Sequence, residues 1–176
     1  MQMKEIEVKI LEINPEKIRK ILKKHRANIV MPKNLQINEF YKNAETKKSG
    51  VTLRLRKNIL GNTIAIKSKL RFVKGHKVMH EYETKIEDFE KMKKAVELLG
   101  FKQIGAVEAM REDWKFNGCL VSIVKLPNIP IYVEIEGTKS AILKIAKLFG
   151  YSEKDYYPKI IYEKYNIKTR FWRFKK

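Results

Sequence analysis

Short segments in which charged and apolar residues alternate recur along the whole chain, and they constrain its fold more than any other feature. In MKEIEVKI, residues 3–10, Glu5, Glu7 and Lys9 alternate with isoleucine and valine. A period of two residues is typical of a strand that buries one face. The same pattern returns in the segments VTLRLRK, NTIAIKSK, HEYETKI, AMREDWKF and IYVEIEG.

One such segment alone would fit an ordinary strand whose charged face points into water. The recurrence of the pattern and the sorting of the charges by sign favour another arrangement. Arg54 and Arg56 form an Arg-x-Arg pair in a chain whose usual cation is lysine, and two guanidinium groups on one face suit phosphate or carboxylate. We therefore expect a sheet that curls so that its charged faces look inward at one another.

The composition indicates one globular domain with a preference for anionic partners. The chain has 176 residues, of which 44% are hydrophobic, enough for a single sizeable core. Its 39 Lys and Arg against 20 Asp and Glu give a formal net charge of +19, which favours nucleotides, polyphosphate, nucleic acid or an anionic surface. A general lysine bias of the source organism would produce the same excess.

Two further features bear on where the protein works. Apolar runs are short and interrupted by charge, so we expect no membrane span and no membrane partner. The single cysteine, Cys119, excludes an internal disulfide and fits a reducing, cytoplasmic compartment. We interpret it as a packed strand residue.

The remaining pattern predicts an α+β domain in which strands dominate. Helices are expected over 14–27, 86–100 and 138–150 and again after Pro158, with Asn14 as a helix cap and a loop over 31–34. On the second helix, the core is expected to include Phe89, Met92, Val96 and Leu99. Strands are expected over 3–10, 35–43, 51–57, 62–70, 77–86, 101–107, 109–117, 119–125 and 130–136. The helices would cover the outward apolar faces of an antiparallel, barrel-like sheet.

Taken in order, these motifs resemble the CYTH domain, also called the triphosphate tunnel metalloenzymes, a family that includes class IV adenylyl cyclases and thiamine-triphosphatases. EIEVK is similar to the family's Glu-x-Glu-x-Lys signature, and LRLR, TIAIK, EYE, MRED and PIYVEIEG follow in the family's order. The resemblance covers nearly the whole chain. It implies an eight-stranded antiparallel β-barrel with helices packed on the outside. We assign residues 1–168 to this single domain and 169–176 to a basic aromatic tail.

The resemblance also implies a role for each charged face of the tunnel. Lys9 and Lys67 are expected to be catalytic. The metal, Mg²⁺ or Mn²⁺, is expected on Glu5, Glu7, Glu134 and Glu136. The triphosphate is expected on Lys9, Arg54, Arg56, Lys67, Arg111 and Lys159, and the tunnel lining is expected to include Glu81, Glu83 and Lys85. These residue types suit phosphoryl transfer, which needs charge neutralisation and positioning.

Three positions depart from the family pattern, and each lacks a negative charge. Val124 stands three residues before the first proline of the final motif, where relatives have an aspartate. Lys85 replaces a third acid of the middle motif, and Lys42 replaces an aspartate after the aromatic pair of the second strand. These changes predict weaker metal binding than in active relatives.

Three functions fit this interpretation. One is a metal-dependent hydrolase of inorganic, nucleoside or thiamine triphosphate, and another is a class IV adenylyl cyclase, which uses the same tunnel. The third is a non-catalytic protein that binds polyphosphate, nucleotides or RNA ends. We expect a monomer or homodimer. The tail TRFWRFKK fits either a nucleic-acid or membrane contact or an aromatic cover for the outside of the barrel.

Overall fold

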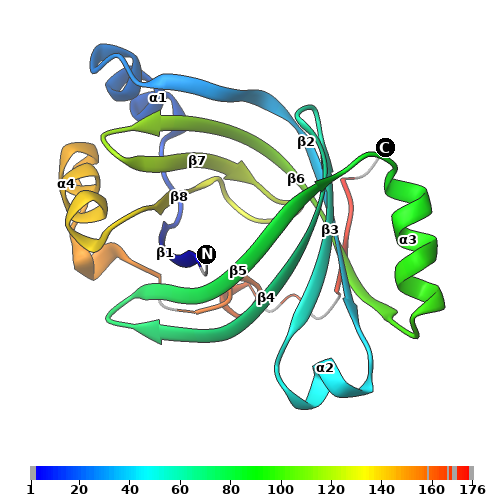
Figure 1. Ribbon diagram of the computed structural model, residues 1–176. Helices are drawn as coiled ribbons and strands as arrows, with labels where there is room; N and C mark the ends of the chain where they lie inside the picture. The colour runs from blue at the N-terminus through cyan, green and yellow to red at the C-terminus, as the bar shows by residue number, and fades with distance from the viewer. Residues whose placement is uncertain (1–2, 158, 166, 168–169, 175–176) are drawn as a thin grey trace.

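An antiparallel sheet that closes on itself forms the body of the protein (Figure 1). The computed structural model describes residues 3–157, 159–165, 167 and 170–174. Eight strands follow one another in the order β2-β3-β4-β5-β1-β8-β7-β6, and β6 pairs again with β2, which confirms the predicted barrel. The strands are β1 Met3–Ile10, β2 Asn28–Lys42, β3 Thr52–Asn58, β4 Gly61–Val73, β5 His76–Ile86, β6 Lys102–Phe116, β7 Cys119–Lys125 and β8 Tyr132–Glu136.

Helices cover the outside of the barrel on two opposite sides (Figure 1). The predicted cap of the first helix is present, because the Asn14 side chain accepts hydrogen bonds from the backbone N–H groups of Glu16 and Lys17 at 3.0 and 3.1 Å. Besides the eight barrel strands, the structure has the helices α1 Pro15–Lys24, α2 Ala44–Lys48, α3 Phe89–Leu98, α4 Lys139–Phe149 and α5 Ile161–Lys164, the 3₁₀ helix η1 Glu153–Asp155 and the short strand β9 Phe171–Trp172.

The outward faces of the strands are apolar and pack against these helices. Val8 and Ile10 of β1 lie in one core cluster with Ile18 of α1 and Phe149 of α4. On the other side, Tyr41, Leu53 and Leu55 pack against Phe89 and Val96 of α3. Because side chains alternate along a strand, the charged residues between them must face into the barrel.

The structure differs from the expectation in four respects. The segment 31–34 is not a loop but part of β2, where the register against β6 shifts on both sides of Met31. Pro32 lacks a backbone donor and is tolerated at such an irregularity. The strands expected over 101–107 and 109–117 are one strand, β6. Leu99, expected in the core, follows the end of α3 and is 73% exposed, and neither α2 nor β9 was expected.

The C-terminal strand β9 pairs with β6 next to the part of β6 that pairs with β7. β9 runs parallel to β6, and the backbone N–H of Ala106 donates to the carbonyl of Arg170 at 2.9 Å. A Cβ on Gly105 would lie 2.7 Å from that carbonyl oxygen, so only glycine lets the chain approach this closely. Trp172 is buried there, whereas Phe171 is 51% exposed. The tail was expected to cover the outside of the barrel, but Trp172 instead packs with Val107 and Ala109 at inward positions of β6.

Gly137, which ends the VEIEG motif, is fixed by packing. A Cβ at this position would lie 2.6 Å from Sγ of Cys119, whose own thiol is buried. We expect Gly137→Ala to destabilise the fold by about 1–3 kcal/mol, the usual cost of overpacking. In a Cys119→Ala background the loss should shrink, because the sulfur is gone. Urea unfolding of the four proteins measures this coupling, and equal losses in both backgrounds would contradict the contact.

Candidate functional site

The inward faces of six strands meet in one continuous chain of ion pairs. Cations and carboxylates alternate along it, and their formal charges cancel although the protein as a whole is strongly basic. The order is Arg56, Glu83, Arg54, Glu81, Lys67, Glu5, Lys77, Glu7, Lys9, Glu134, Arg111 and Asp113. We call these residues the tunnel network.

The two arginines of β3 begin the tunnel network in different surroundings. Nη2 of Arg54 lies 2.6 Å from Glu81 and also donates to Glu83, so this guanidinium has two carboxylates. Arg56 makes a longer contact, 3.5 Å to Glu83, and its Nε donates to Asn38 at 3.3 Å. Burial and the charge of Arg54 lower the pKa of Arg56 to about 10. Arg56 is therefore the arginine that would gain more from an added anion.

Two carboxyl groups share the middle of the tunnel network with Lys67. Nζ of Lys67 lies 3.4 Å from Glu5 and donates to Glu81. Burial and a hydrogen bond to Glu81 raise the pKa of Glu5 to about 8. Burial opposes ionisation of Glu81 as well, but the hydrogen bond from Glu5 and the charges of Arg54 and Lys67 lower its pKa to about 2. Glu81 is thus the more acidic of the two groups.

Lys77 joins the two halves of the tunnel network, and the sequence analysis missed it. Its Nζ lies 3.7 Å from Glu5 and 2.9 Å from Glu7. It occupies β5 four residues before Glu81 and therefore shares its face. This spacing was visible in the sequence, but the predicted lining began at Glu81 and included only Glu81, Glu83 and Lys85 of this strand.

The far end of the tunnel network centres on Glu134. Lys9 lies 3.6 Å from Glu134 and donates to Glu7, while Nη1 of Arg111 lies 2.8 Å from Glu134. Arg111 also contacts Asp113 at 2.8 Å and donates to Oγ of Ser122 at 2.7 Å. Burial acts to lower the pKa of Lys9, but Glu7 and Glu134 outweigh it and raise the pKa above its ordinary value. Asp113 and Ser122 are thus members of the site that the predicted residue set lacked.

The four acids predicted to hold metal are divided between two places. Glu7 lies opposite Glu136 in the β1–β8 register, and Glu134 lies opposite Lys9 on the same two strands. Glu5 instead belongs with Glu81 beside Lys67. Burial and the charge of Glu7 raise the pKa of Glu136, which is the crowding of like charges that a divalent cation would relieve. Among the described residues, no three His, Cys, Asp or Glu are already placed to hold a metal ion.

An apolar layer closes the barrel beside Arg111 and Glu134. Ala109 and Tyr132 occupy the next inward positions of β6 and β8, the strands that carry Arg111 and Glu134. The segment between β7 and β8, together with α5 and β9, covers this layer. Its buried members are Val107, Ala109, Val124, Leu126, Ile129, Tyr132, Ile161 and Trp172. We call it the apolar end. Val124 belongs to this layer and lies opposite Arg111 on β6 and Tyr132 on β8, but it adds no charge to the tunnel network.

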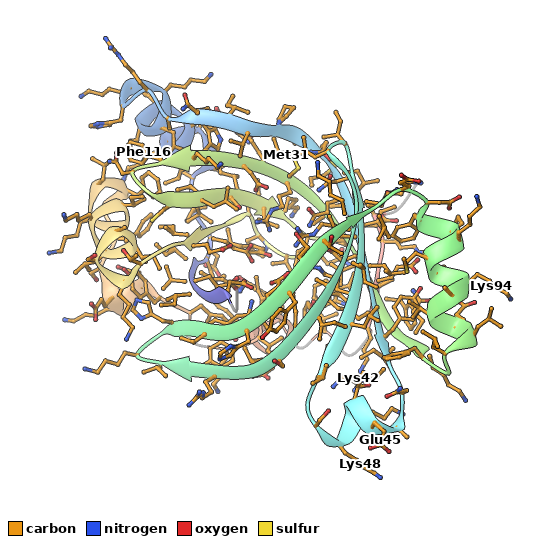
Figure 2. All side chains as sticks on the ribbon, viewed as in Figure 1. Met31, Lys42, Glu45, Lys48, Lys94 and Phe116 are labelled. Carbon is orange, nitrogen blue, oxygen red and sulfur yellow. The ribbon has the colours of Figure 1, made fainter. Side chains whose placement is uncertain are left out.

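Three predicted or noted lysines lie outside the tunnel network. Lys85 shares the inward face of β5 but is exposed. Lys159 is exposed in the segment between η1 and α5. Lys42 is the last residue of β2 and lies beside α2 (Figure 2). The structure thus gathers the other predicted lysines and arginines and leaves Lys85 and Lys159 apart.

The order and spacing of these features match a known family over most of the chain. The CYTH domain matches residues 3–158. The chain belongs to the CYTH family. Over 66 residues it is 35% identical to a Methanocaldococcus jannaschii protein named "Putative adenylate cyclase", and this match spans 38% of each chain.

Solved structures share the CYTH fold. A protein of Pyrococcus horikoshii OT3 superposes with a TM-score of 0.75 at 25% identity, covering 90% of this chain and 98% of that one. A Hippeastrum protein, described as a "Putative adenylyl cyclase" with a dominant triphosphatase activity, has a TM-score of 0.60 at 18% identity and covers 83% and 88%. Within the described ranges, no helix has the length and apolar character needed to cross a bilayer.

Lys77 offers a direct test of the tunnel network. Lys77→Met should lower the free energy of unfolding by about 2–3 kcal/mol, because Glu5 and Glu7 lose a shared countercharge in a mostly buried setting. Lys85→Met, on the same face of the same strand but exposed, should change it by about 0.5 kcal/mol or less. Urea unfolding provides the comparison. If both variants behaved alike, Lys77 would not be a member of the tunnel network.

Proposed function

We propose that this protein binds a triphosphate in its tunnel and hydrolyses it with the help of a divalent metal. The observation that carries the proposal is the alternating tunnel network, in which six cations face six carboxylates. Cations of this kind bind phosphate oxygens, and carboxylates supply the hard oxygen ligands that Mg²⁺ and Mn²⁺ prefer.

The carboxylates fit such a metal by their chemistry. Glu7, Glu134 and Glu136 lie on the adjacent strands β1 and β8, and the raised pKa of Glu136 reflects a local excess of negative charge. We propose that these three residues hold the metal, and that Glu5 joins them when Lys67 and Lys77 turn to the phosphates. When bound, the metal would neutralise phosphate oxygens and lower the pKa of a coordinated water.

The cations of the tunnel network would hold the phosphate chain. Arg54, Arg56 and Lys67 line one part of the tunnel, and Lys9 and Arg111 line the part next to the apolar end. In hydrolysis, the oxygen of water bonds to the terminal phosphorus, and the bond from that phosphorus to the bridging oxygen breaks. The electron pair leaves with the pyrophosphate, whose growing charge the cations stabilise.

The two lysines predicted to be catalytic differ in their electrostatics. The pKa of Lys9 is raised, so we assign it the role of a permanent cation that stabilises charge on the phosphates. Burial and the charge of Arg54 lower the pKa of Lys67, but its contacts with Glu5 and Glu81 are those of an ammonium, so Lys67 would hold the phosphates as a cation and the pair of acids would take the proton of the attacking water. The released proton would leave through the Glu5 and Glu81 pair that Lys67 contacts.

Two other functions share this tunnel. The name of the Methanocaldococcus jannaschii relative favours an adenylyl cyclase, in which the ribose 3′-hydroxyl would replace water as the nucleophile. Val124 favours a protein that binds triphosphate or polyphosphate without turnover, because the apolar end offers the metal no oxygen at that position. Release of phosphate, release of cyclic AMP, or binding without either product separates the three.

Arg56 should contribute more to ligand binding than to stability. Arg56→Ala should weaken tripolyphosphate binding by roughly 1.5–3 kcal/mol, the range for hydrogen bonds to charged groups. Arg54→Ala should in addition destabilise the free protein, since Arg54 is the more buried residue, with 7% of its side chain exposed against 23% for Arg56. Calorimetry and urea unfolding provide the two readouts. Unchanged affinity in Arg56→Ala would remove this arginine from the binding site.

Glu136 tests the proposed metal role. Glu136→Gln keeps the shape of the side chain and removes its charge, so we expect Mn²⁺-dependent release of phosphate from tripolyphosphate to be lost while the fold remains. Glu112→Gln is the matched control, because Glu112 is a buried glutamate that faces α1, where it pairs with Arg19 at 2.9 Å. If Glu136→Gln hydrolysed tripolyphosphate like the parent protein, the acids of β8 would have only a structural role.

A further inference from the structure

A strongly basic surface lies outside the barrel and has no part in the proposed function. The segments 14–28 and 138–150, which contain α1 and α4, together carry nine Lys and Arg and one acidic residue, Glu16. Arg19 pairs with Glu16 and with buried Glu112. The other cations of these segments are all exposed, namely Lys17, Lys20, Lys23, Lys24, Arg26, Lys139, Lys144 and Lys147.

This concentration of charge is a property of one side of the molecule. On the opposite side, α3 and its cap carry Lys91, Lys93 and Lys94 together with three acids, so that helix is balanced. Lys91 pairs with Asp88 at 3.6 Å, and Lys93 pairs with Glu39 at 3.3 Å. Figure 2 shows Lys94 on the side of the barrel opposite Phe116, which lies between α1 and α4. A general lysine bias would give both sides of the barrel a similar excess of positive charge.

A shallow depression adjoins the basic helices at the turn between β6 and β7. Its volume is about 390 Å³, and half-buried Leu120 contributes an apolar wall next to Phe116, which is buried in the core. Asn28 and Asn117 add amide groups and Lys115 adds a cation. A second depression, of about 240 Å³, continues from Asn117 to Ser140 and Lys144 of α4. An apolar wall, amide groups and cations thus lie next to one another in the two depressions.

We propose that this surface binds single-stranded nucleic acid. The lysines of α1 and α4 take the phosphates, and one unstacked base enters the depression, with its face on Leu120 and its edge on the asparagines. A duplex keeps its bases stacked and would not fill the depression. An anionic bilayer favours apolar side chains that insert, and Leu148 is the one large hydrophobic residue of α1 and α4 that is exposed.

The test uses the full-length protein and a 5′-hydroxyl RNA of about twelve nucleotides, a length in the range of single-strand sites, so that no triphosphate engages the tunnel. Fluorescence anisotropy over a series of salt concentrations gives the affinity and its salt dependence. The triple variant Lys24→Glu, Lys115→Glu and Lys144→Glu should bind at least about tenfold more weakly, and its salt slope should fall by about 2. Asn28→Ala should weaken binding with an unchanged slope.

A matched triple variant controls for net charge. Lys48→Glu, Lys91→Glu and Lys94→Glu change the same number of exposed lysines on α2 and α3, and should retain the affinity of the parent protein. Arg56→Ala should also retain it, which separates this surface from the tunnel. Equal losses in the two triple variants, absence of RNA binding by the parent protein, or tighter binding to a duplex or to phosphatidylserine vesicles would overturn the proposal.

Discussion

Charged side chains inside a barrel cost several kcal/mol each unless every one meets an opposite charge. In this protein β3 contributes cations, β5 contributes mainly acids, and β1 contributes both signs between β5 and β8. The compensation therefore exists only when the strands are paired in the observed order and register. A shift of one residue in any strand would turn its charges toward the helices and its apolar residues into the tunnel. The tunnel network thus specifies the barrel as much as the outer cores do.

The same compensation shapes how a ligand can enter. Each phosphate oxygen that takes a cation leaves a carboxylate without its partner, so a bare triphosphate has to compete with the protein's own acids. In the proposed function, the released carboxylates would hold a divalent cation, which would remove that competition. Because the two ligands relieve each other's cost, their binding free energies are coupled. The apolar end sets a limit to this exchange, since Val124 and Tyr132 offer no carboxylate beyond Glu134.

Period-two patterns were enough to predict the barrel and most of the tunnel network, because alternate residues of a strand lie on opposite faces and the sequence therefore shows which residues share a face. The pattern did not give the partners of each charge. That Arg54 meets Glu81 and Glu83, or that Ser122 meets Arg111, depends on pairing between distant strands. Local signals also misled: Pro32 suggested a loop where β2 has an irregular register, and the attachment of β9 depends on space left at Gly105.

The place of β1 in the sheet has a consequence for synthesis on the ribosome. β1 is made before β5 and β8, the strands with which it pairs, so its second edge stays open until residue 136 has emerged. Long-range pairing of this kind is slow, and an unpaired apolar strand is prone to associate with other chains. Glu5, Glu7 and Lys9 interrupt the apolar residues of that strand. Charges on a strand that is still unpaired discourage its association with other chains. The residues that later line the tunnel therefore first protect the nascent chain from aggregation.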